Sequence, residues 1–137
     1  MSAVPQDQPA LLRETSEGVA TLTMNRPQQM NLLTREMLTA LQAAFDEIAA
    51  DASVRVVILA GAGKGFCAGH DLKEIRALGE QPAIAGLFEQ CSRMMTAIER
   101  LPQPVIARVQ GAAAAAGCQQ VAQCDLDRKS TRLNSSH

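Results

Sequence analysis

The sequence predicts a layered α/β fold in which buried parallel strands alternate with amphipathic helices. Residues 54–60 (VRVVILA) and 105–109 (VIARV) are short, nearly continuous apolar runs, rich in β-branched side chains. Such runs are typical of strands that are buried on both faces, as in a parallel sheet. Each run follows a segment with apolar residues at helical spacing, and each leads into a glycine-containing stretch. This alternation favours right-handed crossovers between the strands of one sheet.

The chain is expected to begin with a disordered segment followed by a hairpin. Residues 1–10 are polar and contain two prolines, a composition that disfavours a packed core. Residues 11–14 and 19–24 predict two strands around a turn at residues 16–18. The second strand, VATLTM, alternates between two faces, and its apolar face comprises Ala20, Leu22 and Met24.

Three helices are predicted before residue 102. Thr34 is a good N-cap for a helix that runs to about residue 50. Asp71, with Glu74 three residues later, resembles a capping box for a short helix that Gly79 closes. Pro82 opens a longer helix. The apolar stripe of the first helix is Met37, Leu38, Leu41, Ala44, Phe45, Ile48 and Ala49. That of the longer helix is Ile84, Leu87, Phe88, Cys91, Met94, Met95, Ile98 and Leu101. A further helix is expected through about residue 122, and a strand from Asp125.

Composition excludes several classes of function. The formal net charge of −1 argues against a nucleic-acid partner or an anionic membrane surface. No apolar run approaches the ~20 residues that span a bilayer, and the N-terminus lacks the pattern of a secretory leader. The four cysteines form no C-x-x-C pair, which favours reduced thiols. We therefore expect a cytoplasmic protein.

The last stretch, residues 127–137 (DRKSTRLNSSH), breaks abruptly from the sequence before it. It is polar and basic except for Leu133, which would suit a solvated tail. It also matches a translation of a common short-read sequencing adapter. We interpret it as an artefactual tail, so that the natural chain is expected to continue beyond Leu126.

Two glycine-containing stretches are the candidate functional loops. Residues 61–72 (GAGKGFCAGHDL) and 111–119 (GAAAAAGCQ) each follow a predicted strand and precede a predicted helix. Free backbone N–H groups at helix starts attract negative charge. Two such loops side by side can hold one oxygen atom from two directions, as in an oxyanion hole. The resulting hypothesis is a pocket that polarises a carbonyl group.

Nucleotide-binding alternatives fail on the details of the first loop. A phosphate-binding P-loop requires Ser or Thr after the lysine, but Lys64 is followed by Gly65. A dinucleotide fingerprint requires a third glycine where this chain has Phe66. Neither class of ligand is therefore expected.

Three ordered motifs resemble the enoyl-CoA hydratase/isomerase (crotonase) superfamily. The segment from Phe66 to Glu74 resembles the family's A-x-G-x-D oxyanion segment. Asn25-Arg26-Pro27 with Asn31-Leu32-Leu33 resembles its N-R-P…N-[AS]-[LM] opening, and residues 104–125 resemble its P-[VT]-I-A…CD segment. The resemblance covers about residues 10–126. It implies a crotonase-like ββα spiral fold, truncated after about residue 126, with residues 11–126 as the N-terminal half of the domain.

The resemblance also implies an acyl-CoA or enoyl-CoA thioester substrate, an enolate-like intermediate, and no separate cofactor or metal. By position, the backbone N–H groups of His70 and Ala116 would form the oxyanion hole. The His70 side chain is expected to face solvent or CoA, with acid–base catalysis by the imidazole as the alternative. The residues expected to bind the substrate are Ala68, Gly69, His70, Asp71, Leu72, Lys73 and Ala116. Full-length members form trimers or hexamers, which implies a homotrimer or hexamer here.

One departure bears on the reaction. Gln119 stands where hydratases of the family carry a catalytic Glu, and an amide does not exchange protons at neutral pH. The same Gln occurs in the branch called enoyl-CoA hydratase domain-containing protein 3, which the sequence most resembles. Classical hydration with two Glu residues is therefore not expected. The alternatives are an enzyme that catalyses isomerisation, hydrolysis or a weak hydration, a non-catalytic acyl-CoA-binding member, and an inactive fragment.

Overall fold

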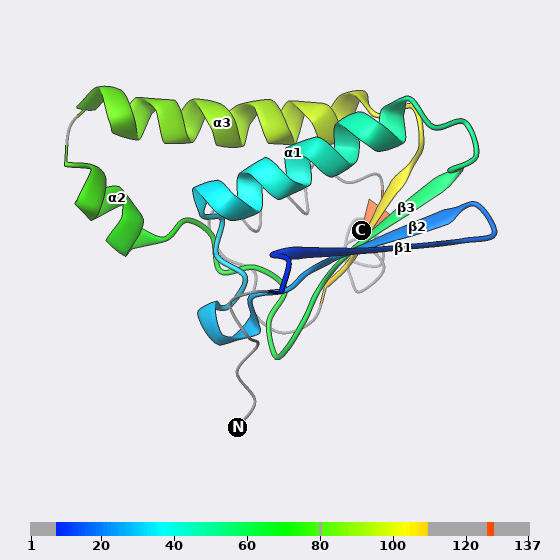
Figure 1. The fold of residues 1–137 in the computed structure, drawn as a ribbon, viewed down its shortest axis with the longest axis horizontal. Helices are drawn as coiled ribbons and strands as arrows, with labels where there is room; N and C mark the ends of the chain where they lie inside the picture. Colours follow the sequence, from blue (N-terminus) through cyan, green and yellow to red (C-terminus); the bar gives the residue numbers. More distant parts are fainter. Residues whose placement is uncertain (1–7, 80, 110–125, 128–137) are drawn as a thin grey trace, which may run out of the picture.

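A computed structural model describes residues 8–79, 81–109 and 126–127 of the chain (Figure 1). These residues form a mixed sheet with the strand order β1-β2-β3-β4-β5. The strands are β1 (Leu11–Ser16), β2 (Val19–Met24), β3 (Val56–Gly61), β4 (Val105–Arg108) and β5 (Leu126–Asp127). β1 pairs with β2 in antiparallel orientation, and the other neighbours are parallel. The predicted α/β fold and the hairpin are thus confirmed.

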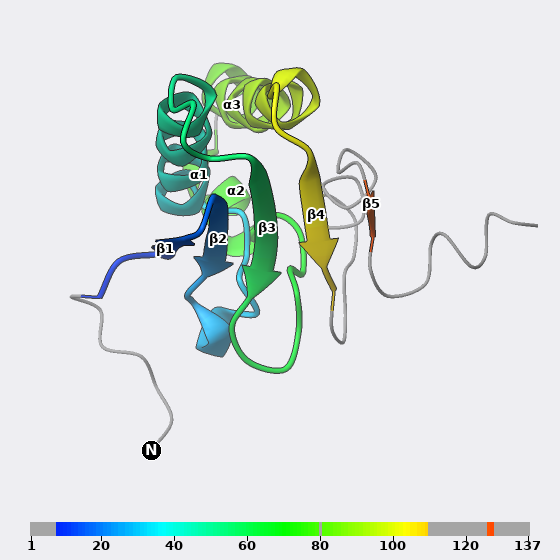
Figure 2. The ribbon, with the colours of Figure 1, turned by 90° about the vertical axis from the view of Figure 1, so that its right-hand side faces the viewer.

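The described helices are α1 (Arg35–Ala49), α2 (Leu72–Leu78) and α3 (Gln81–Arg100), and a short 3-10 helix, η1 (Pro27–Gln29), follows β2. Figures 1 and 2 show α1 and α3 running side by side above the sheet. The Thr34 hydroxyl accepts a hydrogen bond from the Met37 N–H (3.1 Å), which confirms it as the N-cap of α1.

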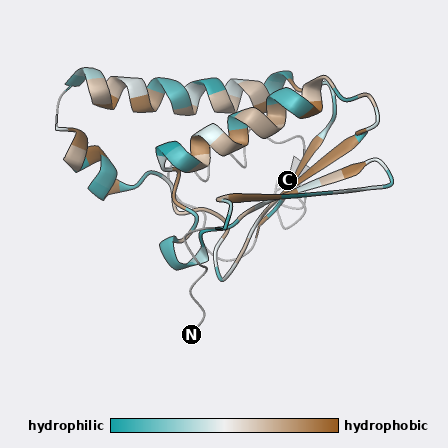
Figure 3. Cartoon of the chain, viewed as in Figure 1, coloured by the Kyte–Doolittle hydropathy of each residue, from teal (hydrophilic) through white to brown (hydrophobic). Residues whose placement is uncertain are grey.

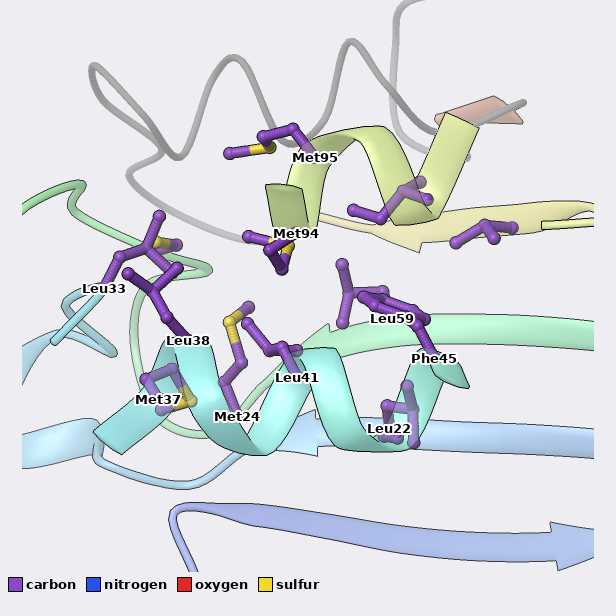
Figure 4. Packing of buried hydrophobic residues seen from close by; sticks show 14 of the residues in the cluster. Leu22, Met24, Leu33, Met37, Leu38, Leu41, Phe45, Leu59, Met94 and Met95 are labelled. Atoms are coloured by element: carbon purple, nitrogen blue, oxygen red, sulfur yellow. The ribbon is translucent and has the colours of Figure 1, made fainter. Parts of the chain in front are cut away.

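The hydrophobic core lies between the two long helices and strands β2 and β3. Ala20, Leu22 and Met24 are fully buried on the predicted face of β2. In Figure 3 the helices alternate hydrophobic and hydrophilic residues, whereas β2 and β3 are hydrophobic over much of their length. Figure 4 shows side chains of α1, α3 and the strands meeting in this layer, among them Leu41, Phe45, Leu59 and Met94. Burial of such side chains is the main favourable term in folding.

Some details differ from the sequence-based expectations. β1 extends to Ser16, so the hairpin turn has only Glu17 and Gly18, both with positive φ (51° and 82°). Positive φ at both central residues matches the right-handed twist of the flanking strands. β3 begins at Val56 rather than at residue 54, and β4 ends at Arg108.

Burial also differs at several predicted apolar positions. Val56 and Ile58 are only half-buried, because the described helices cover one face of the sheet. Ala49 is exposed at the last turn of α1, and Phe88 is 44% exposed although it was assigned to the apolar stripe of α3. Phe88 instead contacts the loop that carries the candidate site.

Two further expectations concern the ends of the described region. Ala10, within the predicted disordered segment, is buried and accepts a hydrogen bond from the Asn25 N–H (2.7 Å). β5 begins at Leu126, one residue after the predicted strand start. The predicted helix that includes Ala116 and Gln119 lies outside the described residues. No helix in the described ranges is both long enough and apolar enough to cross a membrane.

Candidate functional site

The candidate site is built on the loop between β3 and α2, residues 62–71. Two backbone hydrogen bonds pair the end of this loop with the segment after η1. The Ala68 N–H donates to the Met30 carbonyl (3.0 Å), and the Leu33 N–H donates to the Gly69 carbonyl (2.7 Å). Residues 68 and 69 are therefore held in place on the side of the turn that precedes α1.

The backbone N–H of His70 follows directly after this pairing. Among the residues that the structure describes, it has no hydrogen-bond acceptor. A backbone N–H is a strong donor, and most such groups in folded proteins are paired with protein or water. An unpaired N–H at the mouth of a pocket can bind the oxygen of a ligand carbonyl.

A pocket of about 500 Å³ gathers most of the predicted binding residues. It is lined by Gln28, Gln29, Leu32, Ala68, His70, Asp71, Leu72 and Lys73. Gly69 is buried behind its neighbours and does not line the pocket, and Ala116 lies outside the described residues. Gln28, Gln29 and Leu32 were not predicted as lining residues. The N-R-P…N motif could have indicated Gln28 and Gln29, because both lie between its Pro27 and its Asn31.

The His70 imidazole packs against Phe88 of α3. The two rings meet edge to face, with centroids 4.9 Å apart and planes at 87°. Its Nδ1 atom is buried and has no hydrogen-bond partner in the described part of the chain. Burial lowers the pKa of His70 below its ordinary value of 6.5, and the nearby Glu74 carboxylate opposes that shift. The side chain thus does not simply face solvent, and its burial favours the neutral form of the imidazole.

The predicted capping box is half correct. Asp71 is the N-cap of α2, and its carboxylate accepts a hydrogen bond from the Lys73 N–H (3.0 Å). The Glu74 carboxylate does not accept a hydrogen bond from the Asp71 N–H, as a capping box would require. It accepts a hydrogen bond from the backbone N–H of Arg35, the first residue of α1 (3.1 Å). A tertiary contact with the free N–H groups at the start of α1 replaces the local one.

Two further features of the described part of the chain concern metal-binding groups and the state of the cysteines. No group of three or more His, Cys, Asp or Glu residues within the described ranges could hold a metal ion. Cys67 and Cys91 are both buried. Burial raises the pKa of the Cys91 thiol, so it is protonated and a poor nucleophile at neutral pH.

Comparison with known proteins gives one consistent answer. The family model described as enoyl-CoA hydratase/isomerase matches residues 14–130. The enoyl-CoA hydratase domain-containing protein 3, mitochondrial, of Xenopus laevis is 39% identical over 121 residues, which cover 88% of this chain and 41% of the relative. YngF of Bacillus subtilis, named as a hydratase/isomerase, is 42% identical over 81% of this chain and 43% of its own length.

Solved structures agree with the sequence relatives. An enoyl-CoA hydratase from Mycobacterium smegmatis superimposes with a TM-score of 0.86 at 57% identity, covering 88% of this chain and 47% of the other. Human enoyl-CoA hydratase domain-containing protein 3 gives a TM-score of 0.82 at 36% identity, over 86% of this chain and 47% of the other. The chain thus spans less than half the length of these relatives.

Proposed function

Because the chain belongs to the enoyl-CoA hydratase/isomerase family, we propose that its protein binds an acyl-CoA thioester and stabilises an enolate. The observation that carries this proposal is the His70 backbone N–H. It has no partner among the described residues, and His70 lines a pocket of about 500 Å³. The thioester carbonyl oxygen would accept hydrogen bonds from this group and from the Ala116 N–H.

Two backbone N–H donors would provide most of the stabilisation of the enolate. They stabilise the negative charge that forms on the carbonyl oxygen when a proton leaves the α-carbon, and so they acidify that carbon. Loss of one such donor typically raises a reaction barrier by ~3–4 kcal/mol. Ala68, Asp71, Leu72 and Lys73 would complete the binding surface for the thioester, and Gly69, which is buried, would contribute only by holding its neighbours in place. The reaction needs no separate cofactor in this scheme, because CoA is part of the substrate.

The reaction type depends on where the α-proton goes. Gln119 occupies the position of the family's catalytic Glu and cannot take up a proton at neutral pH. Relatives carry both reaction names: one is an enoyl-CoA hydratase domain-containing protein, and another is the 1,2-epoxyphenylacetyl-CoA isomerase of Escherichia coli. Gln119 also favours a second candidate function, a non-catalytic acyl-CoA binder that kept the oxyanion hole.

Proton exchange separates the enzyme from the binder. The protein, expressed from its genomic reading frame, is incubated with butanoyl-CoA in D2O, and deuterium at the α-carbon is followed by mass spectrometry. An enzyme exchanges this proton in a protein-dependent way. Binding without exchange identifies the binder, and absence of binding contradicts both candidates.

Two variants assign the roles of individual residues. Gln119→Glu supplies a carboxylate and is expected to increase hydration of crotonyl-CoA. His70→Ala keeps the backbone N–H, so thioester affinity and exchange should stay close to those of the parent protein. A large loss of turnover in His70→Ala would instead identify the imidazole as an acid or base.

The whole protein is proposed to be a cytoplasmic homotrimer or hexamer. The name of the Xenopus laevis relative includes the word mitochondrial, so fractionation with a mitochondrial marker is the appropriate test of location. Light scattering of the purified protein tests the oligomer.

The third alternative is that the polypeptide ending at His137 is inactive because it is a fragment with an artefactual tail. Resequencing of the genomic DNA across codons 120–137 tests whether the tail is an artefact. We expect the adapter-like codons to disappear and the frame to stay open. A genomic stop codon directly after the codon for His137 would contradict the artefact interpretation.

A further inference from the structure

The Asn31 side chain joins the turn after β2 to the loop that carries the candidate site. This side chain is fully buried, and both the oxygen and the nitrogen of its amide form hydrogen bonds with main-chain groups. Its Oδ1 atom accepts a hydrogen bond from the Arg26 N–H (2.8 Å). Its Nδ2 atom donates to the carbonyl oxygens of Ala62 (3.0 Å), Gly65 (3.3 Å) and Phe66 (3.1 Å). A single buried amide thus connects two segments more than 30 residues apart in the sequence.

The backbone around Asn31 is shaped to deliver this amide. Met30 and Asn31 both have positive φ (54° and 51°), a conformation that Asn tolerates better than most residues. The Asn31 N–H donates to the Arg26 carbonyl (2.9 Å), so backbone and side chain together close a ring between these two residues. The turn therefore has little freedom to move its side chain elsewhere.

The loop on the other side of the contact is equally constrained. A Cβ atom on Gly61 would lie 2.4 Å from the Phe66 carbonyl oxygen and 3.0 Å from Asn31 Nδ2. A Cβ atom on Gly63, where φ is +88°, would lie 2.6 Å from Pro27 Cβ. The chain from β3 to Phe66 fits against the turn with no room for a side chain at these two glycines.

We propose that Asn31 is a positioning residue for the candidate oxyanion hole. Its amide fixes residues 62–66, and the main chain of Met30 and Leu33 fixes Ala68 and Gly69. His70 is the next residue, so the direction of its N–H is set by this turn. The inference rests on the proposed function of that N–H. A side chain with one acceptor and an NH2 donor is required, because Asp cannot donate to carbonyls when ionised and Leu can do neither.

The test compares Asn31→Asp with a matched variant far from the site. Gln103 is also a buried amide whose nitrogen donates to three carbonyls, those of Ile48 (2.8 Å), Asp51 (3.3 Å) and Val54 (3.1 Å), at the end of α1. Asn31→Asp and Gln103→Glu therefore both replace a buried amide nitrogen that donates to three carbonyls, although Oε1 of Gln103 has no partner in the described part of the chain, whereas Oδ1 of Asn31 accepts from Arg26. Both are expected to lower the midpoint of unfolding.

Only Asn31→Asp should change the site. Because a misplacement of about 1 Å can cost about 100-fold in rate, α-proton exchange of butanoyl-CoA should fall by about that factor, with little change in the Kd of the thioester. Hydrogen exchange at the Ala68 and Leu33 amides, measured without ligand, should become faster. In Gln103→Glu these two amides and the exchange rate of butanoyl-CoA should match those of the parent protein.

The two readouts separate the inference from the function on which it rests. If the parent protein neither binds nor exchanges butanoyl-CoA, the proposed function fails, and amide exchange alone decides whether Asn31 fixes the loop. Unchanged exchange at Ala68 and Leu33 in Asn31→Asp overturns the inference, as does an equal loss of turnover in both variants. If Asn31→Asp does not fold, Asn31→Ser, whose hydroxyl can donate only one hydrogen bond, is measured instead and should show the same amide exchange pattern in weaker form.

Discussion

The carboxylate of Glu74 in α2 accepts a hydrogen bond from the backbone N–H of Arg35, the residue that begins α1 (3.1 Å). The contact places a negative charge at the positive end of the α1 dipole. It also joins α1 to α2, whose first residues, Leu72 and Lys73, line the candidate pocket. A contact between residues so far apart in sequence orders the start of α2, directly after the loop of His70.

The first prediction concerns the energy of this contact. Glu74→Ala should lower the free energy of unfolding by about 1 kcal/mol, because the Arg35 N–H loses its acceptor and the dipole loses its charge. The measurement is urea unfolding at low ionic strength. Glu89→Ala is the control, because it removes an exposed pair with Arg93 (3.0 Å) four residues on, which is worth about 0.2–0.5 kcal/mol. Equal losses in the two variants would mean that the Arg35 contact adds nothing.

The second prediction concerns space at the end of β3. Gly61→Ala should destabilise the protein by about 2–3 kcal/mol, because the new methyl group would lie 2.4 Å from the Phe66 carbonyl oxygen. Gly86→Ala in α3 is the matched control, because nothing lies within 4 Å of its Cβ position. That change should stabilise the helix by about 0.5–1 kcal/mol. Thermal unfolding of both variants checks the pair, and a stable Gly61→Ala protein would contradict the described loop.

The third prediction concerns the ring contact between His70 and Phe88. Phe88→Ala should raise the pKa of His70 toward 6.5, because removal of the ring returns water to the imidazole. An NMR titration of the imidazole, assigned with His70→Asn, measures this pKa directly. Leu72→Ala is the control. Leu72 lines the same pocket but is 70% exposed, so its removal should leave the pKa of His70 unchanged. A pKa that does not move in Phe88→Ala would show that the burial comes from elsewhere.

The fourth prediction follows from the sign of the same shift. The folded protein holds the pKa of His70 below 6.5, so on acidification the unfolded chain takes up this proton first. The contribution of His70 to stability is therefore fully present above pH 6.5 and is lost as the pH falls through the folded pKa. His70→Asn should show a flatter fall of unfolding free energy over that range. Parallel curves for the two proteins would contradict the assignment.

Local patterns in the sequence were sufficient for most of the fold. The alternation in VATLTM predicted the buried face of β2, and Thr34 predicted the start of α1, because each depends on neighbours a few residues away. The loop residues 68 and 70–73 were predicted from a motif and lie together at one pocket. These features depend on the local chain and its family pattern.

Contacts between distant segments could not be derived in the same way. The capping-box pattern predicted a hydrogen bond between Glu74 and the N–H of Asp71. In the folded chain the start of α1 lies close by, and the Glu74 carboxylate accepts from the free N–H of Arg35 instead. Asn31 was part of a motif, yet its three carbonyl partners lie in a loop that only the fold brings near. Phe88 fits the helical period of α3, but the helix extends past the sheet there and its ring contacts His70.

The central claim is that the protein polarises a thioester carbonyl through two backbone N–H groups. The most direct measurement is the 13C NMR shift of crotonyl-CoA labelled at the carbonyl carbon, free and bound to the protein from its genomic reading frame. Two hydrogen bonds to the oxygen withdraw electron density, so we predict a downfield shift on binding that His70→Ala retains. A bound thioester whose carbonyl resonance stays at the position of the free compound would contradict the account.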